Sequence, residues 1–531
     1  MKKKSLFLLT SLAVFSLSGC VILPTTSSTQ GTSSGATPSS SSGGTSPSYE
    51  KVKSKYTYKD FAEYNVYGTD YCPTIGSPKL LVIPVWFTDS SNYVYYDKRE
   101  TVRNDISLAY TGSQSDTGWH SVSSFYQEES NGLCNLTATV SEWYECGYES
   151  STFYVGESNT IELVKMAEAW YFRTHPNEKR TDYDSDHNGY LDGVMLIYAA
   201  PDYVSMQKQS AKNLWAYCYW TSNIAGRSTT NPVANAFFWA SYDFMYTSGR
   251  RAQAQTGTTY GRGDNSNCAI DAHTYIHEMG HVFGLVDYYD YSDHHYCPAG
   301  GISMQDFNIT GHEPYSMMAF GWVDPIVPKQ TTTIEIEPFQ NNHDVVLLSP
   351  NYTGSPFDEY VLVEFYTPTG LNQFDADYKY SGLPRAPRNS GIRVWHVDAR
   401  LGYYKVANNQ WVVDYPNTGT EPNRGSTTRC IHATSNSFDN PDYGSAYGAY
   451  NPKFQEYNIL HLIRNNHLVD THTTEYLTDA DLFTAGSTFS VESFNKQFVE
   501  NNALDSGYSL GWSFKIDSLT NSKAKITFTK A

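Results

Sequence analysis

The segment from His277 to His281 reads HEMGH, with two histidines four residues apart and a glutamate directly after the first. On a helix, residues four apart lie one turn apart on the same face, so both imidazoles can bind one metal ion. A zinc ion suits imidazole and carboxylate ligands and leaves one position for water. Glu278 lies beside the histidines and can take a proton from that water. The pattern predicts a helix that carries a hydrolytic zinc centre.

The residues that follow this motif offer a third ligand. Gly284 comes three residues after His281 and can adopt the positive φ that ends a helix sharply. Asp287 comes three residues later, where the returning chain brings a carboxylate back to the ion, and the whole string is HExxHxxGxxD. We favour Asp287 as the third zinc ligand, with Asp290 as the alternative. A pair of core histidines without metal is the alternative to the whole site, but burying them with a glutamate would be costly.

A second group of oxygen-bearing residues forms the string DSDHNGYLD at residues 184–192. Oxygen side chains at alternate positions, followed by a glycine for the tight turn, are typical of a calcium loop. The predicted calcium ligands are Asp184, Asp186, Asn188, Asp192 and the backbone carbonyl of Tyr190. Met195 occupies the twelfth position, where an EF-hand has glutamate, so we predict a structural calcium site rather than a sensor. A surface turn without an ion is the alternative.

One further pair, His396 and Asp398, lies two residues apart on an expected strand, so both side chains face the same side. We interpret this pair as structural. Binding of an ion is the alternative.

The elements around these residues differ between the two halves of the chain. In the first half, apolar runs and helical periodicity predict strands at 79–88, 136–143 and 194–198, and helices over about 97–127 and 161–175. After Pro328, short apolar or alternating runs are separated by Gly, Pro and Asn, which is typical of a mainly β structure. The strands expected there are 333–336, 345–348, 360–365, 392–397, 512–516 and 524–528, with one helix-like segment near 457–465.

The N-terminus has the features of an export signal. Lys2, Lys3 and Lys4 precede an apolar stretch that ends in Leu17-Ser-Gly-Cys20. This order is similar to a bacterial lipoprotein signal, in which Cys20 is lipidated and becomes the mature N-terminus. An uncleaved anchor helix or a plain signal peptide is the alternative. A Ser-, Thr- and Gly-rich stretch follows and is expected to be a flexible tether.

These observations predict an α+β protein with four segments. They are a lipoprotein signal peptide at 1–19, a tether from lipidated Cys20 to residue 52, a catalytic domain at 53–328 and a mainly β C-terminal domain at 329–531. The chain would then lie on the bacterial cell surface, attached to the membrane by its N-terminal lipid.

Composition excludes one large class of partners. The 531 residues carry a formal net charge of −18, whereas a nucleic-acid-binding protein needs basic surface to displace counterions from phosphates. Seven cysteines remain besides Cys20, an odd number, so at least one thiol is unpaired, and the pairing of the others does not follow from the sequence.

Several segments together resemble the immune inhibitor A-type secreted metallopeptidases, a bacterial zinc family related to the metzincins. The similarity is carried by HEMGHVFGLVDYYD at 277–290, by GGISMQDFNI and HEPYSMMAFGW at 300–322, by the segment 121–144, and by the strands at 360–366 and 391–398. The resemblance implies a metzincin-like peptidase domain, with a twisted sheet and an active-site helix, followed by a sandwich-like β domain. It also places Met304 in the Met-turn under the metal, with Met317 or Met318 as less favoured positions. No pro-segment with a recognisable switch residue precedes the first strand.

The function expected from these observations is a cell-surface-anchored zinc-dependent endopeptidase that acts on protein or peptide substrates, with Glu278 as general base. Two alternatives belong to other classes. One is a surface adhesin or glycan-binding lipoprotein with a relic peptidase core, and the other is a zinc hydrolase of non-peptide amide bonds. The intact Glu278 favours an enzyme over a relic, because a relic has no need of the base.

Overall fold

The computed structural model describes residues 47–55, 72–222, 226–246, 268–289, 297–379, 383–407, 410–419, 428–431, 458–469 and 473–531, with the strands alone described within 401–431. The expected signal peptide, Cys20, most of the tether and Asp290 lie outside these residues. Residues Pro47–Ala531 form one compact unit that mixes helices and sheets, as an α+β protein does. Within the described residues, no helix has both the length and the apolar character needed to cross a bilayer.

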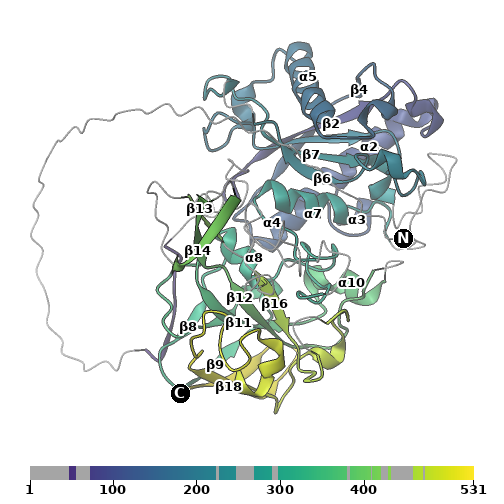
Figure 1. Cartoon of the computed structure of the whole chain (residues 1–531). Coiled ribbons are helices and arrows are strands. Elements are labelled where there is room, and N and C mark those ends of the chain that lie inside the picture. Colours follow the sequence, from purple (N-terminus) through teal and green to yellow (C-terminus); the bar gives the residue numbers. More distant parts are fainter. Residues whose placement is uncertain are drawn as a thin grey trace, which may run out of the picture. The chain divides into compact units, whose positions relative to one another are not determined.

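The N-terminal half is built on a sheet with the strand order β3-β2-β5-β7-β6, and β4 also pairs with β2 (Figure 1). The strands are β2 (Lys79–Trp86), β3 (Thr137–Val140), β4 (Tyr144–Glu145), β5 (Val194–Tyr198), β6 (Tyr217–Trp220) and β7 (Ala236–Ser241). All pairings in this sheet are parallel except that between β6 and β7, which is antiparallel. In the described part of the chain, β6 is therefore an outer strand of reversed direction.

Strand β2 lies inside the sheet although it contains Pro84, which has no backbone N–H to donate. Its first half pairs with β3 as far as Val82, and its second half pairs with β4 from Val85 onward. Pro84 therefore falls where the neighbouring strand is interrupted, so the sheet loses no hydrogen bond on that side.

Helices cover both faces of this sheet. Leu81, Ile83 and Val85 of β2 pack in one apolar core with helix α5 (Ser158–Thr174). Leu80 and Val82 point to the other face and pack in a second core. The helices on that second face are α2 (Arg99–Thr111), α4 (Val122–Glu129) and α7 (His273–Val282). A sheet buried on both faces explains why its strands read as continuous apolar runs.

The C-terminal half contains two sheets that share an apolar core of their own. The first has the order β1-β8-β10-β11-β12-β16, the second β17-β18-β19-β9. The strands of the first are β1 (Tyr49–Lys51), β8 (Ile326–Pro328), β10 (Val345–Leu348), β11 (Glu359–Tyr366), β12 (Gly391–Asp398) and β16 (Leu460–Ile463). Those of the second are β9 (Thr332–Ile336), β17 (Thr488–Phe489), β18 (Trp512–Leu519) and β19 (Ala524–Lys530).

Smaller elements complete the description. The remaining α-helices are α3 (Gln114–Thr117), α8 (Pro314–Ala319), α9 (Phe339–Asn342) and α10 (Gln373–Asp377). A three-stranded sheet of order β14-β13-β15 is formed by β13 (Leu401–Ala407), β14 (Gln410–Gly419) and β15 (Thr428–Ile431).

The structure differs from the sequence-based expectations in two places. The segment expected to be helical near 457–465 contains strand β16, which pairs with β12 and is fully buried, so tertiary pairing overrides the local pattern. The tether was expected to reach residue 52, but Tyr49–Lys51 form strand β1 against β8, and Glu50 pairs with Lys329. The other expected strands and helices coincide with observed elements to within a few residues.

Candidate metal centre

Helix α7 presents the HExxH motif and then stops abruptly. Gly284 has a φ of +108°, a conformation that residues with a Cβ rarely adopt. The Leu285 amide donates to the Gly280 carbonyl, 3.0 Å away, and closes the last turn. The chain then reverses, so that Asp287 returns to the same side of the helix as His277 and His281.

These three side chains bring their ligand atoms together. Asp287 Oδ1 lies 2.9 Å from His277 Nε2 and 3.1 Å from His281 Nε2, and the two Nε2 atoms are 3.1 Å apart. The imidazole rings stand nearly perpendicular, at 88°. The trio predicted from the sequence therefore forms one cluster that can hold a metal ion. Asp290 lies outside the described residues.

Backbone carbonyls fix how the two imidazoles are oriented. His277 Nδ1 lies 2.7 Å from the Met304 carbonyl, and His281 Nδ1 lies 2.9 Å from the Leu285 carbonyl. A carbonyl oxygen only accepts, so each Nδ1 carries the proton and each neutral Nε2 presents a lone pair. Two lone pairs and a carboxylate oxygen then lie within 3.1 Å of one another. This donor set fits a divalent cation such as zinc.

In the absence of a cation, a proton on the imidazole of His281 balances the Asp287 carboxylate instead. Burial opposes the imidazolium form of His281, but the nearby Asp287 carboxylate raises the pKa of His281 to about 9. Burial alone would raise the pKa of Asp287, yet His281 and His277 hold it well below its usual range. The carboxylate is thus kept ionised and available to a metal.

Glu278 lies next to the cluster and has the properties of a proton carrier. It is 5 % exposed, and its Oε2 has no hydrogen-bond partner among the described residues. Burial raises the pKa of Glu278, and the two histidines partly offset this effect. A buried carboxyl group with a raised pKa and a free oxygen is suited to general acid–base chemistry.

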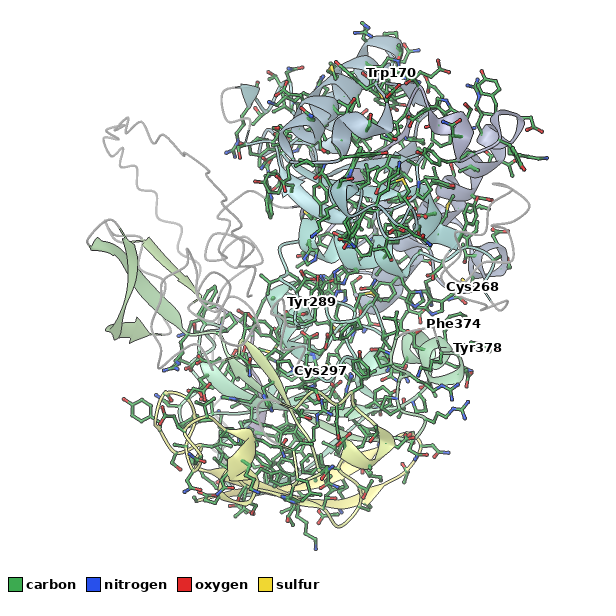
Figure 2. All side chains as sticks on the ribbon, turned by 45° about the vertical axis from the view of Figure 1, so that its right-hand side comes forward. Trp170, Cys268, Tyr289, Cys297, Phe374 and Tyr378 are labelled. Atoms are coloured by element: carbon green, nitrogen blue, oxygen red, sulfur yellow. The ribbon has the colours of Figure 1, made fainter. Side chains whose placement is uncertain are left out.

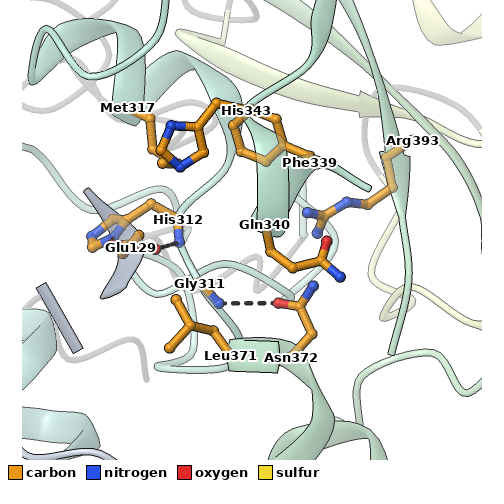
Figure 3. A pocket seen from close by; sticks show the side chains of 10 residues that line it. All are labelled: Glu129, Gly311, His312, Met317, Phe339, Gln340, His343, Leu371, Asn372 and Arg393. Atoms are coloured by element: carbon orange, nitrogen blue, oxygen red, sulfur yellow. Dashed lines mark hydrogen bonds and ion pairs between the residues drawn. The ribbon is translucent and has the colours of Figure 1, made fainter. Parts of the chain in front are cut away.

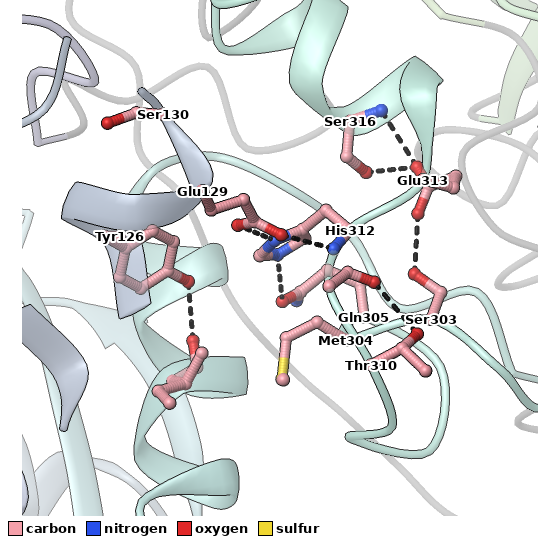
Figure 4. Close-up of polar contacts among 12 residues, drawn as sticks. Tyr126, Glu129, Ser130, Ser303, Met304, Gln305, Thr310, His312, Glu313 and Ser316 are labelled. Atoms are coloured by element: carbon pink, nitrogen blue, oxygen red, sulfur yellow. Dashed lines mark hydrogen bonds and ion pairs between the residues drawn. The ribbon is translucent and has the colours of Figure 1, made fainter. Parts of the chain in front are cut away.

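A loop from Ser303 to Asp306 lies next to the centre, and Figure 4 shows its residues Ser303, Met304 and Gln305. Met304 is fully buried, and its carbonyl holds His277. The Gln305 carbonyl accepts from the Tyr288 amide at 2.8 Å, which ties this loop to the segment carrying Asp287. Met304 is thereby joined to a predicted zinc ligand, whereas Met317 and Met318 lie on helix α8, and the Met-turn assignment stays a prediction.

A buried pair behind this loop holds the Gln305 side chain. His312 Nδ1 donates to Glu129 Oε2 at 2.7 Å, the His312 amide donates to Glu129 Oε1 at 2.6 Å, and His312 Nε2 lies 3.2 Å from Gln305 Oε1. Gln305 in turn packs against Gly280 of α7. The contacts among Glu129, His312, Gln305 and Gly280 were not predicted from the sequence, because these residues come from segments far apart in it.

Tyr289 is a second residue near the centre to which the sequence assigned no role. Its hydroxyl hydrogen-bonds the Asp287 carboxylate, and its ring lies nearly parallel to that of His277, with centroids 6.4 Å apart. Figure 2 shows Tyr289 between the part of the molecule with the parallel sheet and the part with the C-terminal strands. Burial raises the pKa of its hydroxyl, with Asp287 and Glu278 adding to the effect. The residue therefore stays neutral and able to donate.

Strand β6 lies alongside α7. Burial raises the pKa of Cys218 on this strand, and the charges of Glu278 and Asp287 raise it further. The described cysteines are not joined to one another by disulfides, and Cys268 and Cys297 lie apart in Figure 2.

The predicted calcium loop forms a tight turn whose oxygens accept backbone hydrogen bonds. Asp184 accepts from the Asn188 and Gly189 amides at 2.9 and 3.0 Å. Asp192 accepts from the Lys79 and Ser185 amides at 2.9 and 3.0 Å. Asp186 and Asn188 accept from amides inside the loop as well. Calcium binding by these residues stays a prediction.

A pocket beside the Glu129–His312 pair does not belong to the centre, because none of the three candidate ligands lines it (Figure 3). Its lining residues are Glu129, Gly311, His312, Met317, Phe339, Gln340, His343, Leu371, Asn372 and Arg393.

Comparison of the chain with protein-family models found no match, and comparison with curated proteins found none either.

Proposed function

We propose that this protein is a zinc-dependent endopeptidase anchored to the outer surface of a bacterial membrane. The observation that carries the proposal is the cluster of two Nδ1-protonated imidazoles and one carboxylate beside a buried glutamate with a free oxygen. Zinc bound there would polarise a scissile carbonyl and lower the pKa of a water molecule.

The residues of the chain supply the remaining steps. Glu278 accepts the proton of the attacking water and delivers it to the leaving amine, acting first as base and then as acid. Its burial supports this role, because a raised pKa brings the carboxyl group closer to the pH at which both forms are accessible. Tyr289 hydrogen-bonds Asp287 and so helps to hold it in place, and its hydroxyl is the donor we propose for a developing oxyanion.

The position of β6 supports a mode of substrate binding. It is an outer strand among the described residues, it runs antiparallel to β7, and it contacts helix α7. An extended peptide added to such an edge gains main-chain hydrogen bonds without a sequence requirement. We therefore propose unfolded or extended protein segments as the substrate class.

The finer assignments belong to the same proposal. They are a metzincin-like catalytic domain followed by a sandwich-like β domain, structural calcium at 184–192, lipidation at Cys20 and the resemblance to immune inhibitor A-type peptidases. The loop under His277 that contains Met304 supports the metzincin assignment, and the shared core of the two C-terminal sheets supports the sandwich.

The experiment compares the mature chain with a Glu278→Gln variant. Both are expected to bind one zinc ion in the HExxH cluster, because Glu278 is not a ligand, whereas cleavage of an unfolded protein falls by a factor of about 10²–10⁴ in the variant. Zinc is measured by elemental analysis and cleavage with and without a chelator. A Glu162→Gln variant, altered on the exposed face of α5, is the matched control and should keep full activity.

The other outcomes separate the alternatives. Zinc in both proteins with cleavage in neither would favour an amide hydrolase of non-peptide substrates, which digestion of cell-wall material would then test. Folded parent protein without zinc at His277 and His281 would contradict the metal centre, and binding to glycans would become the function to examine.

A further inference from the structure

We propose that Glu359, His396 and Asp505 form a second metal site, which binds a divalent cation of the zinc type inside the C-terminal half. This inference is independent of the proposed peptidase activity. None of its residues belongs to the HExxH segment, and the three come from β11, β12 and the loop before β18.

The site begins with an interruption in the strand pattern. On β11, Val361, Val363 and Phe365 face the core between the two C-terminal sheets, and Glu359 lies two residues before them on the same face. On β12, Ile392 and Val394 face that core, and His396 follows on the same face. Glu359, at the start of β11, and His396, near the end of β12, thus occupy positions where the alternation predicts apolar side chains.

The side chains converge. His396 Nε2 lies 2.8 Å from Glu359 Oε1, and each of the three residues offers a ligand atom within 4.8 Å of the others. The HExxH cluster has the same short approach, with 2.9 Å between His277 Nε2 and Asp287 Oδ1.

Burial makes this arrangement costly without a cation. Glu359, His396 and Asp505 are 2, 4 and 5 % exposed. Asp505 Oδ1 is buried and has no hydrogen-bond partner among the described residues. A buried carboxylate oxygen without a donor is destabilising, and a bound ion would satisfy it.

Arg400 is a positive charge beside the group, and the Asp398 carboxylate offsets it. Arg400 is engaged by Asp398, with contacts of 2.8 and 2.7 Å to its two oxygens, and it lies 3.8 Å from Glu359 Oε2. As a metal ligand His396 must be deprotonated, and the neutral imidazole with the two carboxylates then carries two negative charges, which one divalent cation balances. A ligand set of one imidazole and two carboxylates suits zinc, whereas calcium prefers oxygen ligands throughout.

The backbone already holds the ligands in position. The amides of Asp505 and Ser506 both donate to Glu359, the second at 2.9 Å to Oε2. The cation would therefore pin the loop before β18 onto the sheet that contains β11 and β12. We infer a structural role for this ion, in joining the two C-terminal sheets.

The test counts zinc in the mature chain by elemental analysis after dialysis against metal-free buffer. We expect two zinc ions per chain in the parent, one in Asp505→Asn and one in His277→Asn. Asp517→Asn, which alters an exposed carboxylate on β18, is the matched control and should keep both ions. If the parent binds only one zinc ion and Asp505→Asn also binds one, the proposal is overturned.

A second measurement does not depend on activity or on the HExxH site. In the His277→Asn background, added zinc should raise the melting temperature, and Asp505→Asn should abolish that rise. If Asp505→Asn does not fold, crystals of the parent decide: an anomalous peak at the zinc edge between Glu359, His396 and Asp505 supports the site. Clear electron density for the three side chains without an anomalous peak between them would overturn the proposal.

Discussion

Gly280 lies at the closest approach between helix α7 and the loop that carries Met304. A Cβ built at this position would lie 2.1 Å from Gln305 Oε1, so the amide would have to move. Because His312 holds that amide at 3.2 Å, we expect Gly280→Ala to destabilise the protein by about 1–3 kcal/mol through overpacking. It should also weaken zinc retention, since the neighbouring Met304 carbonyl orients His277. Thermal unfolding and dialysis against a chelator measure the two effects.

A double variant gives this prediction a sharp control. In a Gln305→Ala background the added methyl group has space, and alanine is favoured over glycine in a helix interior by about 1 kcal/mol. In that background Gly280→Ala should be neutral or should raise the free energy of unfolding. Equal destabilisation in both backgrounds would show that contact with Gln305 is not the cause.

At the scale of single residues, the sequence predicted the ligand cluster but not its supports. The spacing of His277, His281 and Asp287 is local, so one helix and one glycine turn suffice to bring them together. Gln305 and Tyr289 act through contacts that depend on how distant loops pack, and no local pattern encodes these. The pair His396 and Asp398 was interpreted as structural, with binding of an ion as the alternative; in the structure Asp398 pairs with Arg400 and His396 with Glu359.

The start of helix α7 is joined to helix α10 through His273. The imidazole lies between Asp271, 2.6 Å from Nδ1, and Asp375, 3.3 Å from Nε2, and it stacks on Trp119. Burial opposes protonation, but Asp375 and Asp271 raise the pKa of His273 to about 9. Because this pKa lies above the ordinary value near 6.5, the protonated form stabilises the folded state fully below about pH 6.5. That contribution is lost as the pH rises through 9.

The expected consequence is a pH-dependent effect of His273→Asn. The variant should lose more unfolding free energy at pH 6.5 than at pH 9, by about 2 kcal/mol. Denaturant unfolding in the presence of a chelator measures this without a contribution from metal binding. The exposed His467 supplies the control, because His467→Asn should shift stability little and equally at both pH values. A constant difference between parent and His273→Asn would contradict the ion-pair explanation.

The loop at 184–192 carries a prediction of its own. If calcium binds there, added calcium raises the unfolding free energy by about 2.7 kcal/mol at one hundred times its dissociation constant. Asp186→Asn should abolish this gain, because Asp186 is one of the predicted carboxylate ligands and the substitution removes its negative charge. Asp182→Asn, an exposed change just before the loop, should leave it intact. Equal melting temperatures with and without calcium would favour the simple turn.

At the scale of elements, strands that are apolar throughout were predictable, because burial on both faces leaves no other pattern. Strand β16 was not, since its four residues are too few for periodicity to separate strand from helix. Strand β1 was missed because Tyr49–Lys51 follow a low-complexity stretch and form an exposed edge. Its partner β8 lies about half the length of the chain away in the sequence, so only the fold brings the two strands together.

The cores of the whole molecule are distributed unevenly between the two halves. One core lies wholly within residues 81–239 and another wholly within 326–528. The third, which packs against α7, draws on both halves, with Phe283 and Met304 on one side and Leu362 and Trp395 on the other. The apolar core that supports helix α7, and with it the candidate metal centre, therefore needs residues from both halves of the chain.

This distribution predicts how the two halves behave when they are prepared as separate fragments, 47–328 and 326–531, both of which include strand β8. The fragment 47–328 keeps the core under α5 but exposes the apolar side chains around α7, so we expect it to lose zinc and to bind a hydrophobic dye. The fragment 326–531 keeps its own sheet-to-sheet core and should unfold cooperatively. In the intact chain, calorimetry should show α7 melting together with the C-terminal half. A fragment 47–328 that binds zinc and unfolds in a sharp transition would mean that the shared core is not required to hold the metal centre.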